Sequence, residues 1–160
     1  VTFVCDSGNK YLSKMFNDFW MIDQGFLDRP HFGDLRDLIT RRHSEGSTVT
    51  LAPGDTLLVA YNRMRLYDIS QLPVVENGKV VGILDESDVL FAVYGHDERF
   101  AEKVSGAMTS RLETLPATAA LSELLPIFSS GRVAIVEEGG NFLGLITRVD
   151  LLNHLRRGMR

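Results

Sequence analysis

The segment GILDESD at residues 82–88 returns at residues 144–150 as GLITRVD, and an apolar run with helical spacing follows each copy. The correspondence extends upstream of both copies. TLAP at 50–53 corresponds to TLPA at 114–117, and LPVV at 72–75 corresponds to VAIV at 133–136. The chain is therefore a tandem duplication, and each half can be interpreted by comparison with the other.

Each copy has the pattern strand, helix, strand, strand, helix. In the first copy, Pro53 and Gly54 precede a run of apolar residues at helical spacing, and two β-rich segments follow at 72–75 and 80–84. The Asn77-Gly78 pair between them predicts a hairpin, because both residues accept the positive φ of its turn. Gly139-Gly140-Asn141 occupies the same place in the second copy. The pattern predicts an α/β (α+β) fold in which each repeat is a small β-sheet with helices on one face.

A repeat of about sixty residues buries too little surface to be stable alone, so we expect the two halves to pack against each other. A helix over 34–40, with Asp34 as its N-cap, is predicted before the first copy. A matching helix over 98–104 is predicted before the second copy. The predicted divisions are an N-terminal segment at 1–27, a linker and helix at 28–46, and repeats at 47–99 and 100–160.

This arrangement resembles the CBS domain, and two copies in tandem resemble the Bateman module. That resemblance implies packing by pseudo-two-fold symmetry with a cleft on each side, and binding of an adenosyl compound. In such modules the ribose is bound by the phrase Gly, two apolar residues, Thr or Ser, two variable residues and Asp. Thr147 and Asp150 match this phrase fully. Asp88 in the first copy also matches, which implies a weaker cleft there, but Asp85 replaces the hydroxyl residue.

The resemblance also implies which residues form the opposite wall of the cleft at Thr147 and Asp150. Ile69, Ser70 and Gln71 would contact the adenine and the tail of the ligand, and Ser47 and Thr48 would lie on the entering strand. Many members of the family have an aromatic residue at the position of Ile69 and an acid at that of Ser70. This chain therefore lacks one stacking surface and one partner for an ammonium group.

The repeated phrase also has a purely structural interpretation. A Ser, Thr or Asp followed three residues later by an acid, at the start of an apolar helix, is a capping box. Asp85 preserves this role, but it also places a second carboxylate where the phosphate of a nucleotide would lie. That carboxylate disfavours AMP or ATP at the first cleft and does not penalise the sulfonium of S-adenosylmethionine.

Residues 1–27 have a different character. The strings DSGNKYLSK at 6–14 and DFWM at 18–21 resemble the C-terminal end of the pyridoxal-phosphate catalytic domain of the cystathionine β-synthase family. The resemblance implies that Ser7 would contact the pyridine nitrogen of the cofactor in a full enzyme. It further implies a parent lyase that joins serine to homocysteine in cysteine biosynthesis. We expect no catalytic residue in this chain, because the rest of such a domain does not occur in it.

Composition points to a cytoplasmic module without a metal. The net charge of −4 argues against nucleic acid, which favours clustered basic surface, and no apolar run approaches the length of a membrane span. A single cysteine excludes an internal disulfide, and the four dispersed histidines form no metal-ligand pattern.

The sequence therefore predicts a regulatory module in which S-adenosylmethionine, AMP or ATP acts allosterically on the activity or stability of the parent enzyme. Two alternatives remain at this stage. One is a constitutive oligomerisation module without an effector, and the other is the same module in a related cysteine synthase. A homodimer is expected in either case. The apolar helix residues proposed for its contact are Leu124, Leu125, Ile127 and Phe128, or Val89, Leu90 and Phe91.

Overall fold

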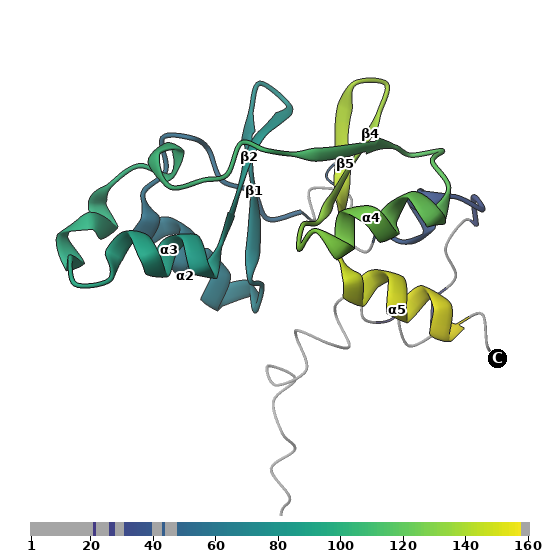
Figure 1. Ribbon diagram of the computed structural model, residues 1–160, viewed down its shortest axis with the longest axis horizontal. Coiled ribbons are helices and arrows are strands. Elements are labelled where there is room, and N and C mark those ends of the chain that lie inside the picture. Colours follow the sequence, from purple (N-terminus) through teal and green to yellow (C-terminus); the bar gives the residue numbers. More distant parts are fainter. Residues whose placement is uncertain (1–20, 22–25, 28–30, 40–42, 44–47, 158–160) are drawn as a thin grey trace, which may run out of the picture. The chain divides into compact units, whose positions relative to one another are not determined.

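The computed structural model describes residues 21, 26–27, 31–39, 43 and 48–157. The chain divides into two compact units, Val1–Gly33 and Asp34–Arg160. Both repeats belong to the larger unit, shown as a ribbon in Figure 1. In the smaller unit, Phe26 and Leu27 are exposed. The prediction for Ser7 lies outside the described residues.

The first repeat contains α2 (Leu57–Tyr67), β1 (Gln71–Glu76), β2 (Lys79–Asp85) and α3 (Glu86–Val93). Strands β1 and β2 are antiparallel, and the turn between them has positive φ at Asn77 (51°) and Gly78 (77°), which confirms the predicted hairpin. The strand expected upstream is reduced to one parallel bridge. There the N–H of Leu51 donates to the Pro73 carbonyl at 2.9 Å, and the N–H of Val75 donates to the Leu51 carbonyl at 2.7 Å.

The second repeat has the same order of elements. It contains β3 (Glu113–Pro116), the short 3-10 helix η6 (Leu121–Glu123), α4 (Leu124–Ser129), β4 (Ala134–Glu138), β5 (Asn141–Ile146) and α5 (Arg148–Arg157). Its sheet has the order β3-β4-β5, with β3 parallel and β5 antiparallel to β4. The β4–β5 turn has positive φ at Gly139 (60°) and Gly140 (79°). The predicted fold class, helices with small sheets, is confirmed.

The first connector has the predicted N-cap, but its helix ends at Asp37 and is shorter than the predicted helix over 34–40. Asp34 caps the 3-10 helix η2 (Leu35–Asp37) by accepting the N–H of Arg36 at 3.0 Å. The guanidinium of Arg36 also pairs with Glu138 on β4 at 3.1 Å. Leu35, Leu38 and Ile39 are buried in the core of the second repeat, so this segment packs on the repeat that is more distant in sequence.

The single helix predicted over 98–104 is wrong. The connector instead forms two 3-10 helices, η4 (Asp97–Ala101) and η5 (Val104–Gly106), with Glu102 extended between them. Long-range pairing explains the break. The Glu102 carbonyl accepts the N–H of Leu57 at 3.0 Å, and the N–H of Val104 donates to the Asp55 carbonyl at 2.8 Å. These bonds to the start of α2 hold the chain extended where a continuous helix would turn.

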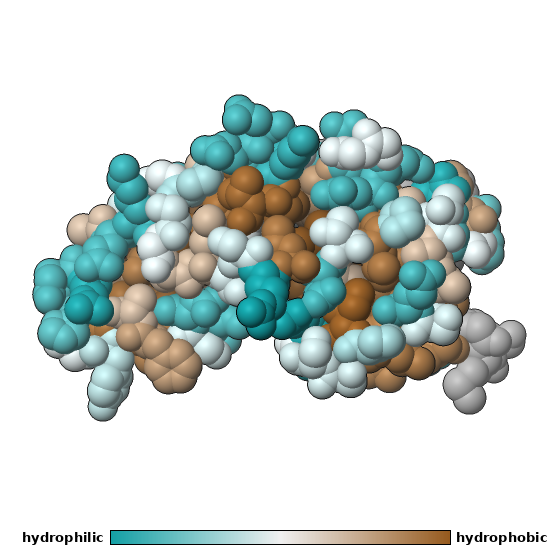
Figure 2. Space-filling view, turned by 45° about the horizontal axis from the view of Figure 1, so that its top comes forward, coloured by the Kyte–Doolittle hydropathy of each residue, from teal (hydrophilic) through white to brown (hydrophobic). Residues whose placement is uncertain are grey.

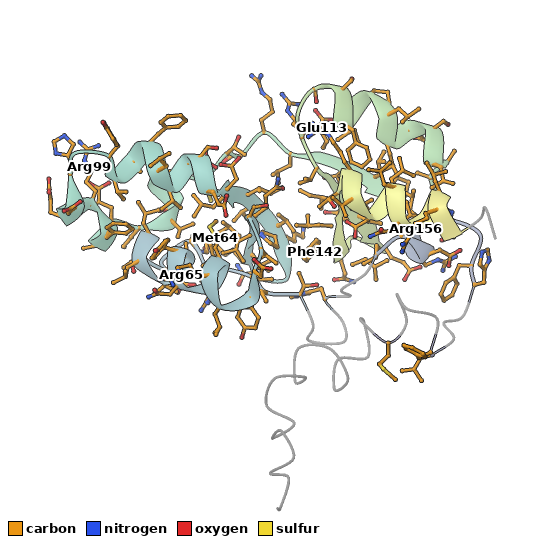
Figure 3. All side chains as sticks on the ribbon, turned by 90° about the horizontal axis from the view of Figure 1, so that it is seen from below. Met64, Arg65, Arg99, Glu113, Phe142 and Arg156 are labelled. Atoms are coloured by element: carbon orange, nitrogen blue, oxygen red, sulfur yellow. The ribbon has the colours of Figure 1, made fainter. Side chains whose placement is uncertain are left out.

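Each repeat has its own core, and a third cluster joins them. Its buried members are Ile83 from β2, Ile135 from β4, Phe142 from β5 and Val133 just before β4. Figure 3 labels Phe142, and strands β2 and β5 are in contact. The expected packing of the two halves is thus present, and it buries mainly β-branched and aromatic side chains.

The predicted exposed apolar faces are correct only in part. Three of the four residues named on α4 are buried, because Leu124, Ile127 and Phe128 form its core-facing stripe at helical spacing. On α3, Val89 is likewise buried. The exposed apolar residues among those named are Leu125, Leu90 and Phe91. Within the part of the chain that the structure describes, no helix has the length and apolar character needed to cross a bilayer.

Candidate functional site

Both copies of the repeated phrase form a helix cap. In the first copy the N–H of Asp85 donates to Asp88 Oδ2, and the N–H of Asp88 donates to Asp85 Oδ1, each at 2.9 Å. This reciprocal pair is a capping box at the start of α3. The structural interpretation of the phrase is therefore correct at Asp85 and Asp88.

The second copy has the same geometry with one additional bond. The N–H of Thr147 donates to Asp150 Oδ2 at 2.8 Å, and the N–H of Asp150 lies 3.4 Å from Thr147 Oγ1. The Thr147 hydroxyl also donates to Asp150 Oδ2 at 2.6 Å. A carboxylate has about four lone-pair positions, so a group such as that of Asp150 can serve several donors at once.

A cavity of ≈ 610 Å³ lies beside the second copy. This volume falls in the range of small-molecule sites. Both repeats supply its walls. The first contributes Thr48, Val49, Asp68, Ile69, Ser70, Gln71 and Pro73, and the second contributes Gly131, Arg132, Val133, Leu145, Thr147, Arg148, Val149 and Asp150.

The cavity brings together most of the residues expected at the second cleft. Thr48 and the run from Ile69 to Gln71 form part of one wall, and Thr147 and Asp150 lie on another. Ser47 lies outside the described residues. Asp85 and Asp88 are not lining residues of this cavity, and a binding role for them stays a prediction.

The turn after α2 contributes lining residues of the first repeat to the cavity. Asp68 adopts the left-handed conformation (φ 52°), and its N–H and that of Ile69 both bond to the Met64 carbonyl. The helix ends there, and β1 begins three residues later. Ile69 is half-buried and packs against the core of the first repeat while it lines the cavity. Its core role and its proposed binding role are therefore compatible.

Three charged lining residues were missed from the sequence: Asp68, Arg132 and Arg148. The duplication contained a signal for one of them. When LPVV at 72–75 is aligned with VAIV at 133–136, Arg132 falls opposite Gln71. A residue expected in the cleft from one repeat thus identifies its counterpart in the other.

The two arginines are held in different ways. The guanidinium of Arg148 donates to the Phe128 carbonyl at 2.7 and 3.3 Å. That of Arg132 forms an ion pair with Glu113, which is labelled in Figure 3 at the start of β3. A carbonyl is neutral, so these two bonds leave the positive charge of Arg148 uncompensated, whereas a carboxylate compensates that of Arg132.

The first capping box has an unusual electrostatic property. Burial raises the pKa of the Asp88 carboxyl above its ordinary value of 3.8, and the nearby Asp85 carboxylate raises it further. The hydrogen bond from the Asp85 N–H acts in the opposite direction. The folded state therefore binds a proton at Asp88 more tightly than the unfolded state does.

This raised pKa leads to a pH-dependent stability prediction. Relative to an Asp88→Asn variant, the wild-type protein should lose stability as the pH rises from below 3.8 through the raised pKa, because the folded state must then give up a proton that it favours. Asparagine keeps an oxygen that can accept the Asp85 N–H. Urea unfolding of both proteins at pH 4 and pH 7 measures the difference. A wild type that gains stability over the variant across this range contradicts the prediction.

Comparison with known proteins agrees with the duplicated architecture. The model of the family "CBS domain" matches residues 35–95 and 102–157. The chain belongs to the CBS-domain family and contains two copies of the domain in tandem.

Curated relatives include enzymes of different kinds. The chain is 29% identical over 175 residues to cystathionine beta-synthase of Dictyostelium discoideum, a match that covers 100% of this chain and 35% of that protein. It is 34% identical over 108 residues to inosine-5'-monophosphate dehydrogenase of Methanocaldococcus jannaschii, covering 65% of this chain and 21% of that protein. The chain thus spans about a third or less of the length of these two relatives.

Among solved structures, that of CBSX2 in complex with AMP has a TM-score of 0.68 at 15% sequence identity, covering 79% of this chain and 98% of that one. At this level of identity the similarity establishes the fold.

Proposed function

We propose that this chain is a regulatory CBS-domain pair that binds an adenosyl compound in the cavity lined by Thr147 and Asp150. One observation carries the proposal. A cavity of ligand size is walled by both repeats, and a Thr–Asp pair lies beside apolar side chains in it. The apolar wall suits a purine base, and the Asp150 carboxylate suits the hydroxyls of a ribose. The AMP complex of the structurally similar CBSX2 supports the same class of ligand.

The proposed parent protein is a pyridoxal-phosphate-dependent cystathionine β-synthase, with its own catalytic domain as the partner of this module. The match to the Dictyostelium discoideum enzyme supports this, because it covers the whole chain, including the residues before the first repeat. S-adenosylmethionine, AMP and ATP are the candidate effectors.

Coupling between ligand binding and the activity of the parent enzyme would follow from the fact that both repeats line the cavity. A ligand in contact with both repeats binds best to one relative arrangement of them, and it shifts the equilibrium toward that arrangement by its difference in affinity. It also stabilises the folded state by about 2.7 kcal/mol at a concentration one hundred times its Kd. Activity of the parent enzyme and stability of the module should therefore respond to the same ligand.

Titration calorimetry of the chain with S-adenosylmethionine, AMP, ATP and adenosine tests the proposal. Saturable binding of at least one of them is the expected result, with a rise in melting temperature for the ligand that binds. Guanosine and GMP serve as controls for purines in general. Heats that never saturate with any adenosyl compound contradict it.

A second candidate, an oligomerisation module, is favoured by exposed apolar residues on the last helix of each repeat. These are Leu90, Phe91 and Tyr94 in or next to α3, and Val149, Leu152 and Leu155 on α5. Figure 2 shows apolar surface in brown among hydrophilic residues in teal on one face of the molecule. Analytical ultracentrifugation of a Phe91→Glu variant tests this candidate, which predicts a shift from dimer to monomer.

A further inference from the structure

Both arginines of the cavity lining are connected to the segment from the end of α4 to the start of β4. The Arg148 guanidinium bonds to the carbonyl of Phe128 near the end of α4. The backbone N–H of Arg132 donates to the carbonyl of Ile127, the residue before Phe128, at 3.3 Å. Two arginines that line the cavity are thus bonded to neighbouring residues of α4. A pair of guanidinium groups in a cavity lining suits the anionic part of a ligand.

The guanidinium of Arg132 is already paired with a carboxylate of the same chain. Its partner, Glu113, is not a lining residue of the cavity but pairs with Arg132 from the start of β3. Both side chains are about one third exposed, at 34% for Arg132 and 39% for Glu113. An ion pair with this exposure is weak, so a phosphate with a higher charge can compete for the guanidinium.

We propose that the Glu113–Arg132 ion pair is a latch, opened by the phosphate of an adenosine 5'-phosphate that binds in the cavity. The inference rests on the proposed function and names the class of ligand for that site. Arg148 supplies a standing positive charge. Arg132 adds a second charge only when it exchanges Glu113 for the phosphate. The exchange replaces one acceptor of the guanidinium by another and breaks no covalent bond.

Glu113 directly follows the connector between the repeats, so its release can affect that connector. Glu113 is the first residue of β3, and Leu112 before it packs against the cluster that joins the two repeats. Further upstream, Thr109 exchanges two backbone hydrogen bonds with Ile83 of β2, both at 2.9 Å. Release of Glu113 removes a side-chain restraint at the end of this segment. Phosphate binding should therefore loosen the connector near residues 109–113.

Calorimetry with AMP and adenosine on three variants tests the latch. Glu113→Gln frees Arg132, so AMP should bind up to about fivefold more tightly, the factor expected from removal of a surface ion pair. Arg132→Gln removes the competing charge, so AMP should bind about tenfold more weakly or worse. Adenosine carries no phosphate, and its affinity should be the same in both variants. Arg111→Gln, an exposed connector residue outside the cavity lining, controls for the loss of positive charge in Arg132→Gln.

The possible results separate the latch from the function on which it rests. If neither AMP nor adenosine binds the wild-type protein, the proposed function fails and the latch fails with it. If both bind equally and Glu113→Gln alters neither, or alters both alike, the latch is overturned while the adenosyl site stands. The latch also predicts faster amide hydrogen exchange at residues 109–113 with AMP than with adenosine. Equal exchange with the two ligands contradicts it.

Discussion

Replacing Asp150 by alanine is expected to weaken binding of an adenosyl compound by about 1–3 kcal/mol, the scale of lost hydrogen bonds to a charged group. Asp150 lies in the cavity wall and already accepts two bonds from Thr147, which fix its orientation. A carboxylate held in this way loses little freedom when it accepts the hydroxyls of a ribose. Titration calorimetry with AMP measures the loss directly.

The duplication provides a matched control. Asp88 is the counterpart of Asp150 in the first repeat, and it does not line the cavity. Asp88→Ala removes the corresponding capping bond, in which the Asp85 N–H donates to Asp88 Oδ2 at 2.9 Å. Both variants should lose about 1 kcal/mol of stability through their caps. Only Asp150→Ala should lose affinity at the cavity. Two variants that lose stability alike while both keep full affinity would assign Asp150 to capping alone.

Replacing Ile135 by alanine is expected to cost about 2–5 kcal/mol in the free energy of unfolding, the range for a large aliphatic side chain removed from a packed core. Ile135 is fully buried on β4, in the cluster that also contains Ile83 of the first repeat. The truncation would leave a void between two elements that neither repeat can close alone. Chemical denaturation of the variant measures the loss.

Leu66→Ala is the control for this effect. Leu66 is an aliphatic residue of similar size near the end of α2 and is 76% exposed, so its loss should change stability by no more than about 0.5 kcal/mol. If the two variants lose the same stability, the cluster between the repeats contributes little. The two halves would then be held together by other contacts.

Sequence patterns were sufficient for the features that depend on neighbours in the chain. The Asn77-Gly78 turn and its Gly139-Gly140 counterpart have the positive φ values that hairpins of this kind require. The repeated phrase predicted both helix starts, because a capping box needs only residues three apart. The family resemblance, and not a local pattern, led to the expectation that Ile69 and Thr147 line one cleft, and both line the cavity.

The misses involve contacts between residues distant in sequence. The acidic opening and apolar spacing of 98–104 favoured one helix, but the bonds from Leu57 to Glu102 and from Val104 to Asp55 impose an extended break. Helical spacing on α4 revealed an apolar stripe and could not show that it faces inward. The pairing of Arg132 with Glu113 joins the loop before β4 to the start of β3 and has no local signal.

A crystal structure of the chain grown with excess AMP would show whether an adenosyl compound binds in this cavity. We expect density in the cavity, with ribose hydroxyls at hydrogen-bond distance from the Asp150 carboxylate, about 2.6–3.2 Å, and with the base against Ile69 and Leu145. The phosphate should lie toward Arg148. An empty cavity at saturating AMP, or a nucleotide bound only elsewhere on the molecule, would rule out adenosyl binding at Thr147 and Asp150.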